Sequence, residues 1–173
     1  MTKTIIHFIL LSLVMILLQT VCNKIILFDV AVPLVFIYVI LRLPINWHSN
    51  IVLTIAFLMG LLVDVFNNTP GMNALSCTVL AGVRPAVFNA YVPRGEELAE
   101  STMPSISSLG IGVYAKYMVT LVLIYCTLIF FIQAFTVRDV LLTIERVLAS
   151  TLLTAVILLG LDSLVSTKRE KGL

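Results

Sequence analysis

The chain has few charged residues, and this shortage excludes several classes of protein. Of its 173 residues only 12% are charged and 60% are hydrophobic, and the mean hydropathy is +1.12. An ordinary soluble domain is about 45–50% apolar and about 25% charged. A soluble core of this size cannot hide so much apolar surface, so the excess must face lipid. The composition therefore excludes a typical soluble enzyme and a disordered chain.

Basic residues and cysteines are scarce as well. The net charge is only +2, and no basic stripe alternates with aromatic residues, so the sequence has no nucleic-acid footprint. The three cysteines, Cys22, Cys77 and Cys126, are an odd number spread over apolar segments, which is no disulfide framework. We interpret them as buried polarisable side chains. A bridge between Cys22 and Cys77 stays open, because both are expected near the outer face.

Residues that carry catalysis are sparse and scattered. The two histidines, His7 and His48, are isolated, and no cluster of His, Cys and Asp has metal-ligand spacing. Ser76 and Ser107 have no candidate base in a recognisable motif. There is no glycine-rich phosphate loop. We therefore expect no enzymatic activity, no cofactor and no metal.

The apolar runs that are present predict helices. They are continuously apolar, whereas strands of a membrane barrel alternate apolar and polar residues. A span needs about 20 mostly apolar residues. The first run is longer than a signal-peptide core and is followed by no cleavage site, so we interpret it as a retained helix. We expect one integral membrane domain over residues 1–173, an all-α bundle of about six helices. The first four predicted helices are residues 4–21, 27–41, 51–66 and 73–91. The fifth has its hydrocarbon span at residues 118–135, and the sixth is apolar over residues 147–161, with Glu145 and Arg146 at its start and Asp162 near its end.

Proline, glycine and asparagine mark the predicted connections. Pro44 should end the second helix, because it lacks an amide proton and restrains the preceding residue. Residues 67–71 (Asn-Asn-Thr-Pro-Gly) are dense in turn formers. Asn73 is the expected N-cap of the fourth helix, and Pro85 should kink that helix. Residues 93–108 are the one extended polar segment, interpreted as a solvated loop or a short interfacial helix, with a cytoplasmic contact as the alternative.

The basic residues predict the orientation of the bundle. Six spans place both termini on one side, and the positive-inside rule places that side in the cytoplasm. The basic residues on that side are then Lys3, Arg42, Arg94, Lys168, Arg169 and Lys171, against Lys24 and Arg138 outside. The turn at residues 67–71 would lie outside and the polar segment 93–108 inside.

Several charged residues fall within or beside the predicted spans. A charge near the bilayer centre costs about 2.5–3.5 kcal/mol on insertion scales, so it should face protein or water. We expect an intramembrane polar cluster in the outer half, with Arg84 below it, made by Asp29, Asp64, Arg84, Glu145 and Arg146. Such a cluster could bind a ligand or a partner helix. The alternative is that these charges pair within the bundle or reach the headgroups by snorkelling.

Two faces carry small residues at helical spacing. Gly60 and Asp64 are four residues apart and share a face of the third helix. Ala74, Thr78 and Gly82 form a similar face on the fourth helix. Small residues let helix backbones approach closely in membranes. The faces therefore predict either internal packing or docking of a partner helix.

The stretch from Gly60 to Asp64 (Gly-Leu-Leu-Val-Asp), followed by Pro70 and Gly71 before the next helix, resembles the MreD family of bacterial rod shape-determining membrane proteins. Residues 33–38 (Pro-Leu-Val-Phe-Ile-Tyr), followed by residues 41–44 (Leu-Arg-Leu-Pro), look like the family's second helix and its exit. The resemblance is specific between Asp29 and Gly82 and rests on layout beyond that. The polar segment 93–108 is longer than in many family members.

The resemblance implies a non-enzymatic role in the cell-elongation complex of the bacterial inner membrane. MreD proteins associate with the single-span protein MreC and are linked through it to RodA, its partner transpeptidase and MreB filaments. On this basis we expect Gly60, Asp64, Pro70 and Gly71 to form a partner-binding groove for MreC. The family fold also resembles the substrate-binding subunits of energy-coupling-factor vitamin transporters. A transporter subunit is therefore the alternative function.

Overall fold

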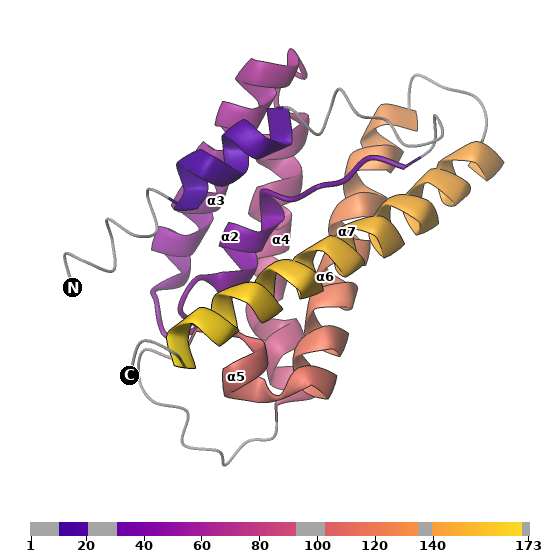
Figure 1. The fold of residues 1–173 in the computed structure, drawn as a ribbon. Helices are drawn as coiled ribbons and strands as arrows, with labels where there is room; N and C mark the ends of the chain where they lie inside the picture. The colour runs from indigo at the N-terminus through magenta and orange to yellow at the C-terminus, as the bar shows by residue number, and fades with distance from the viewer. Residues whose placement is uncertain (1–10, 21–30, 93–102, 135–139, 171–173) are drawn as a thin grey trace.

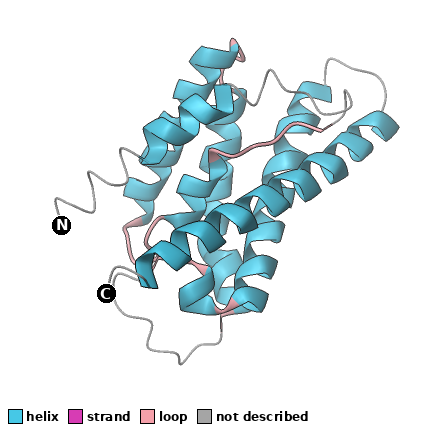
Figure 2. Ribbon diagram, viewed as in Figure 1, coloured by secondary structure: helices cyan, strands magenta, loops and turns pink. Residues whose placement is uncertain are grey.

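The computed structural model describes residues 11–20, 31–92, 103–134 and 140–170, with side chains up to residue 163. Every regular element in this part of the chain is a helix (Figure 2). The elements are the helix Leu11–Thr20, α2 (Ile37–Arg42), α3 (Ser49–Asn67), α4 (Met72–Tyr91), α5 (Ile106–Leu109), α6 (Ile111–Ala134) and α7 (Val140–Glu170). The all-α prediction is confirmed for the described residues.

Three helices are long and apolar enough to cross a membrane. They are Ser49–Asn67, Ile111–Ala134 and Val140–Ser163. The helix α4 has 20 residues but is less apolar, because it carries Asn73, Arg84 and Asn89. Membrane-helix character is thus confirmed, whereas the count of six spans stays a prediction. The start of the first predicted helix, residues 4–10, lies outside the described residues.

The helices pack around a short central element. The helix α4 packs against α3 on one side and α6 on another, and α6 packs against α7, which crosses the bundle diagonally (Figure 1). All six residues of α2 are buried, and α2 contacts both α4 and α6. The core of the molecule is therefore centred on α2, and the longer helices surround it.

The second predicted helix, residues 27–41, is wrong over residues 31–36, and its residues 27–30 lie outside the described residues. Residues 31–36 are not helical, and α2 begins only at Ile37. A buried apolar run has the same composition in extended and helical form, so periodicity cannot distinguish them. Pro33 also biases the residue before it away from the helical region. The predicted end is confirmed: α2 ends at Arg42, and Leu43 before Pro44 is extended, with ψ 142°.

The predicted turn at residues 67–71 is confirmed. Asn68 has φ 57° and Gly71 has φ 79°, both in the left-handed region. Glycine adopts this region without steric cost, and asparagine tolerates it better than most residues. These two positions reverse the chain between α3 and α4 and make the two helices an antiparallel hairpin.

The last two long helices extend beyond their predicted apolar spans. The helix α6 runs from Ile111 to Ala134 and contains the described part of the span 118–135, and α7 runs from Val140 to Glu170 and contains the span 147–161. Residue 135 lies outside the described residues. Hydropathy locates the apolar part of a helix, whereas backbone hydrogen bonding continues beyond it. Within the polar segment 93–108, Ser105 and Ser108 form a capping box that starts α5. Residues 93–102 lie outside the described part of the chain.

Candidate functional site

Asp64 joins the end of α3 to the start of α4. Its Oδ1 accepts hydrogen bonds from the Thr69 hydroxyl (2.8 Å), the Asn73 amide (3.0 Å) and the Asn73 side chain (2.9 Å). Its Oδ2 accepts from the Ala74 amide (2.9 Å). The side chain is buried, with a residue exposure of 4%. Asp64 therefore caps α4 from the neighbouring helix, and the positive end of the α4 dipole stabilises the carboxylate.

The predicted cap of α4 at Asn73 is wrong. The N-cap residue is Gly71, which has no side chain to offer, and Asn73 is the second residue of the helix. Asn73 instead relays the network, because its Oδ1 accepts from the Tyr125 hydroxyl at 2.6 Å. Asp64 provides the cap instead. The turn between α3 and α4 brings its carboxylate close enough to accept hydrogen bonds from the free amides of α4.

The helices α3 and α4 approach each other closely at Gly60. A Cβ atom added there would lie 2.6 Å from the Ala74 Cα and 2.6 Å from the Asn73 carbonyl oxygen. Both neighbours are backbone atoms, so no side-chain rotation can relieve the contact. The packing face predicted from Gly60 is thus occupied by α4 of the same chain.

The hairpin separates the four residues of the predicted partner groove into a buried pair and an exposed pair. Gly60 and Asp64 are buried beneath the first turn of α4, whereas Pro70 and Gly71 are exposed at the turn. A partner would reach the first two residues directly only if α3 and α4 separated. On α4, Ala74 packs at Gly60, whereas Gly82 is exposed.

The non-helical residues 31–36 are held by side chains from two helices. The Val32 amide donates to the Ser150 hydroxyl (3.0 Å), and the Leu34 amide donates to the Thr154 hydroxyl (3.1 Å). Gln19 donates to the Pro33 carbonyl (3.0 Å) and accepts from the Val35 amide (2.7 Å). Irregular backbone at membrane depth is tolerated only where protein or water satisfies its polar groups. These three side chains meet that requirement.

The register of this contact follows from geometry. Two residues of extended chain advance about 6.6 Å, and four residues of helix advance about 6 Å. Every second amide of the extended segment therefore meets every fourth residue of α7. Sequence reasoning missed Gln19, Ser150 and Thr154, although the four-residue spacing of the last two, continued to Asp162, was a readable signal.

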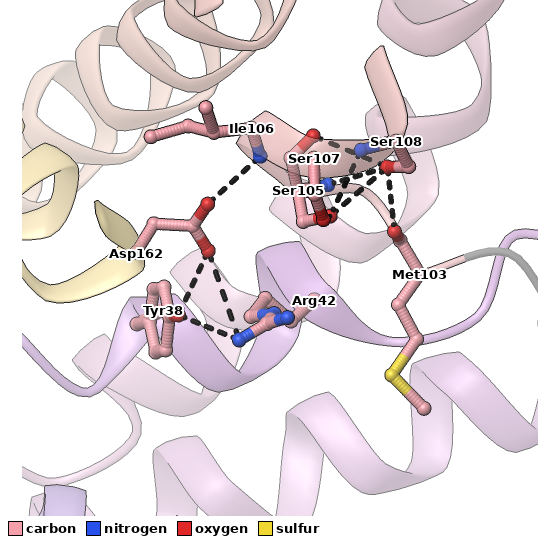
Figure 3. A network of polar contacts seen from close by, with 8 residues as sticks. All are labelled: Tyr38, Arg42, Met103, Ser105, Ile106, Ser107, Ser108 and Asp162. Atoms are coloured by element: carbon pink, nitrogen blue, oxygen red, sulfur yellow. Dashed lines mark hydrogen bonds and ion pairs between the residues drawn. The ribbon is translucent and has the colours of Figure 1, made fainter. Parts of the chain in front are cut away.

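Asp162 connects α7 to α2 and α5 (Figure 3). Its Oδ1 accepts from the Tyr38 hydroxyl (2.9 Å) and lies 3.7 Å from Arg42 Nη1, which also donates to the Tyr38 oxygen (2.8 Å). Its Oδ2 accepts from the Ile106 amide (2.8 Å). Sequence reasoning counted Arg42 and Asp162 separately and missed the pairing.

Arg84 binds the backbone that leaves α2. Its Nε donates to the Tyr117 hydroxyl (3.0 Å), and its Nη2 donates to the carbonyls of Leu41 (3.4 Å) and Leu43. The residue is 2% exposed. Of the two environments expected for Arg84, protein and water, the structure provides protein: its partners are the Tyr117 hydroxyl of α6 and two carbonyls at the end of α2.

The predicted intramembrane polar cluster is not assembled in the described structure. Arg84 is buried among α2, α4 and α6, whereas Glu145 and Arg146 are exposed on α7. Within the described residues no hydrogen bond or ion pair joins Arg84 to either of them. Asp29 lies outside the described residues. Arg84 does not meet Glu145 or Arg146 because position along a helix gives depth, whereas direction around the helix axis decides which side chains meet.

A small cavity lies beside the extended segment. Its volume is about 100 Å³. The polar residues that line it are Gln19, Asn67, Thr69, Asn73 and Gln133, and the apolar ones are Val32, Leu34, Val63, Ile129 and Phe130. Pockets for drug-sized ligands measure about 300–1,000 Å³. This cavity holds a few water molecules or a very small solute, not a vitamin.

The buried polar groups described above have one chemical property in common. Asp64, Arg84, Asp162 and Gln19 each bind backbone atoms of the chain itself. Within the residues that the structure describes, no three His, Cys, Asp or Glu side chains come together as a metal site. What this arrangement can do is fix the positions of helices and of the extended segment.

Comparison of the chain with protein-family models, with curated proteins and with solved structures finds no match.

Proposed function

We propose that the chain is a non-enzymatic integral membrane component of a bacterial cell-elongation complex, which binds MreC and helps to organise peptidoglycan synthesis. In this proposal both termini face the cytoplasm, and RodA, its partner transpeptidase and MreB are reached through MreC. The proposal begins from the resemblance of residues 33–44, 60–64 and 70–71 to the MreD family.

One observation carries the proposal: the residues of the resemblance build a rigid helix hairpin. Gly60 permits the contact of α3 with α4, Asp64 caps α4, and Gly71 supplies the left-handed turn. A protein that presents helix surfaces to partners in a membrane needs such fixed helix positions, because van der Waals packing drives association in lipid. The same residues are therefore expected in a scaffold whether or not they touch the partner.

The alternative is the substrate-binding subunit of a vitamin-type energy-coupling-factor transporter. The cavity beside residues 31–36 is the observation that favours it, since polar side chains line it. Its volume of about 100 Å³ argues against it, because a vitamin-like solute needs several times that space. We therefore prefer the assembly function.

The test is a gentle detergent purification of the tagged chain from its native membranes, followed by mass spectrometry of the proteins that remain bound. An unrelated polytopic membrane protein with the same tag is the matched control. We expect a single-span protein of the MreC type, with RodA or its transpeptidase in smaller amount. Recovery of a membrane coupling protein with paired ATPases, together with tight binding of a vitamin-like solute, would overturn the proposal.

A further inference from the structure

The cavity beside residues 31–36 lies at one end of the helix bundle. Its lining includes Asn67, the last residue of α3, and Gln133, one residue before the end of α6. Both helices are long and apolar enough to cross a membrane, and both end on the same side of the molecule (Figure 1). The 19 residues of α3 span about 28 Å, close to the thickness of a hydrocarbon core. The cavity therefore lies at the level of the lipid headgroups.

The polar side chains of the cavity fall into two groups. Gln19, Thr69 and Asn73 already form hydrogen bonds within the protein. The side-chain amides of Asn67 and Gln133, in contrast, form no hydrogen bond with the residues that the structure describes. Asn67 is partly exposed and Gln133 is exposed, so the two free amides stand at the mouth of the cavity. A molecule in the cavity finds its free polar partners there.

The lining determines the charge of a suitable ligand. Among the described residues, the cavity is lined by amide, hydroxyl and apolar side chains and by no charged one. The Asp64 carboxylate, which contacts Thr69 and Asn73, already accepts four hydrogen bonds. A charged ligand would lose its hydration without gaining a counter-charge, which is costly. The cavity therefore favours a neutral ligand.

The volume and the apolar wall determine its size and chemistry. About 100 Å³ is the space of about three water molecules in the liquid. Water alone fits poorly, because each buried water needs two to four polar partners and side chains such as Ile129 and Phe130 offer none. A short carbon skeleton packs against this apolar wall instead. Each free amide both donates and accepts, and a hydroxyl group matches it on both counts.

We infer that the cavity is a binding site for a glycerol group, a neutral polyol on a short carbon skeleton. Two of its hydroxyls bind Asn67 and Gln133 at the mouth, and its carbon atoms lie against Ile129 and Phe130. The glycerol is either the headgroup of a membrane lipid, whose phosphate remains outside the cavity, or free glycerol. The inference does not depend on the proposed function, because it requires only that α3 and α6 span a membrane.

The first experiment measures binding of free glycerol to the full chain by saturation-transfer NMR, in a detergent without hydroxyl groups that could compete. Asn67→Leu and Gln133→Leu are each expected to weaken binding about two- to tenfold, the effect of one hydrogen bond. Both positions are at least partly exposed, so the variants should fold, and circular dichroism checks this. Asn89→Leu, an exposed asparagine on α4 outside the cavity lining, is the matched control and should bind like the unchanged chain.

The second experiment asks whether a lipid supplies the glycerol. The full chain is placed in phosphatidylcholine vesicles that contain equal amounts of phosphatidylglycerol and phosphatidylethanol, and mass spectrometry identifies the lipids that stay bound. The two anionic lipids carry the same charge and differ in the hydroxyls of the headgroup. Retention of phosphatidylglycerol about tenfold above phosphatidylethanol, lost in Asn67→Leu and Gln133→Leu, would identify a lipid ligand. Binding of free glycerol without this preference would identify free glycerol.

Three outcomes would overturn the inference. Binding of neither probe would mean that the cavity holds water only. Equal binding by the unchanged chain and by both cavity variants would place the bound glycerol elsewhere on the molecule. A loss in Asn89→Leu as large as in Asn67→Leu would show that the cavity is not what the substitutions affect.

Discussion

Replacement of Gly60 by alanine tests the α3–α4 hairpin most directly. The added Cβ would lie 2.6 Å from two backbone atoms of α4. Ordinary van der Waals contacts between such atoms begin at about 3.5 Å, so the helices must separate by close to 1 Å. That separation also lengthens the hydrogen bonds of 3.0 Å and 2.9 Å from the Asn73 and Ala74 amides to Asp64.

The matched control is Gly82→Ala on α4. An added Cβ at Gly82 would meet only the Leu53 Cδ2 atom, at 3.9 Å, which is an ordinary contact. Both substitutions replace glycine by alanine within a helix, and the higher helix propensity of alanine stabilises each variant by about 1 kcal/mol. The difference between the two variants therefore isolates the steric effect, which for overpacking is about 1–3 kcal/mol.

The assay is thermal unfolding in detergent, followed by circular dichroism and by the fluorescence of the single tryptophan, Trp47. A difference of 1 kcal/mol shifts the midpoint of a chain this size by about 2–4 °C. Gly60→Ala is expected to unfold about 2–12 °C below Gly82→Ala, the range that follows from 1–3 kcal/mol. Equal midpoints for the two variants would refute the close approach of α3 and α4 at Gly60.

Three further substitutions test the other contacts of the core. Asp64→Ala removes the acceptor of the first free amides of α4 and should destabilise the chain by about 2 kcal/mol or more, with faster hydrogen exchange in the first turn of that helix; unchanged exchange would contradict the cap. Arg84→Lys should lower the unfolding midpoint, because one ammonium cannot bind the tyrosine hydroxyl and two carbonyls in the planar geometry of a guanidinium; a midpoint equal to that of the unchanged chain would show that those bonds contribute nothing. Thr154→Val leaves a buried backbone amide without an acceptor and should cost about 1–3 kcal/mol. Thr127→Val is its control, since that hydroxyl donates only within its own helix, and equal losses for the two would exclude a role of Thr154 in holding the extended segment.

The elements that the sequence predicted well are those with a local chemical cause. Pro44 ends α2 because of its own ring, and the turn at residues 67–71 needs residues that tolerate positive φ. The apolar runs of α3, α6 and α7 gave helices of membrane length. The non-helical form of residues 31–36 could not be predicted in this way, because two of its amides are bound by α7, more than a hundred residues away in sequence, and a third by Gln19 of the first helix.

The candidate site, too, was predictable only in part from the sequence. The sequence alone identified Asp64 and Arg84 as charges that should face protein or water rather than lipid. Only the tertiary structure decided what they bind: the amides of α4 for Asp64 and the carbonyls at the end of α2 for Arg84. The physical reason is that hydropathy reports the cost of burying a charge, whereas direction around a helix and the path of the chain determine which partner removes that cost.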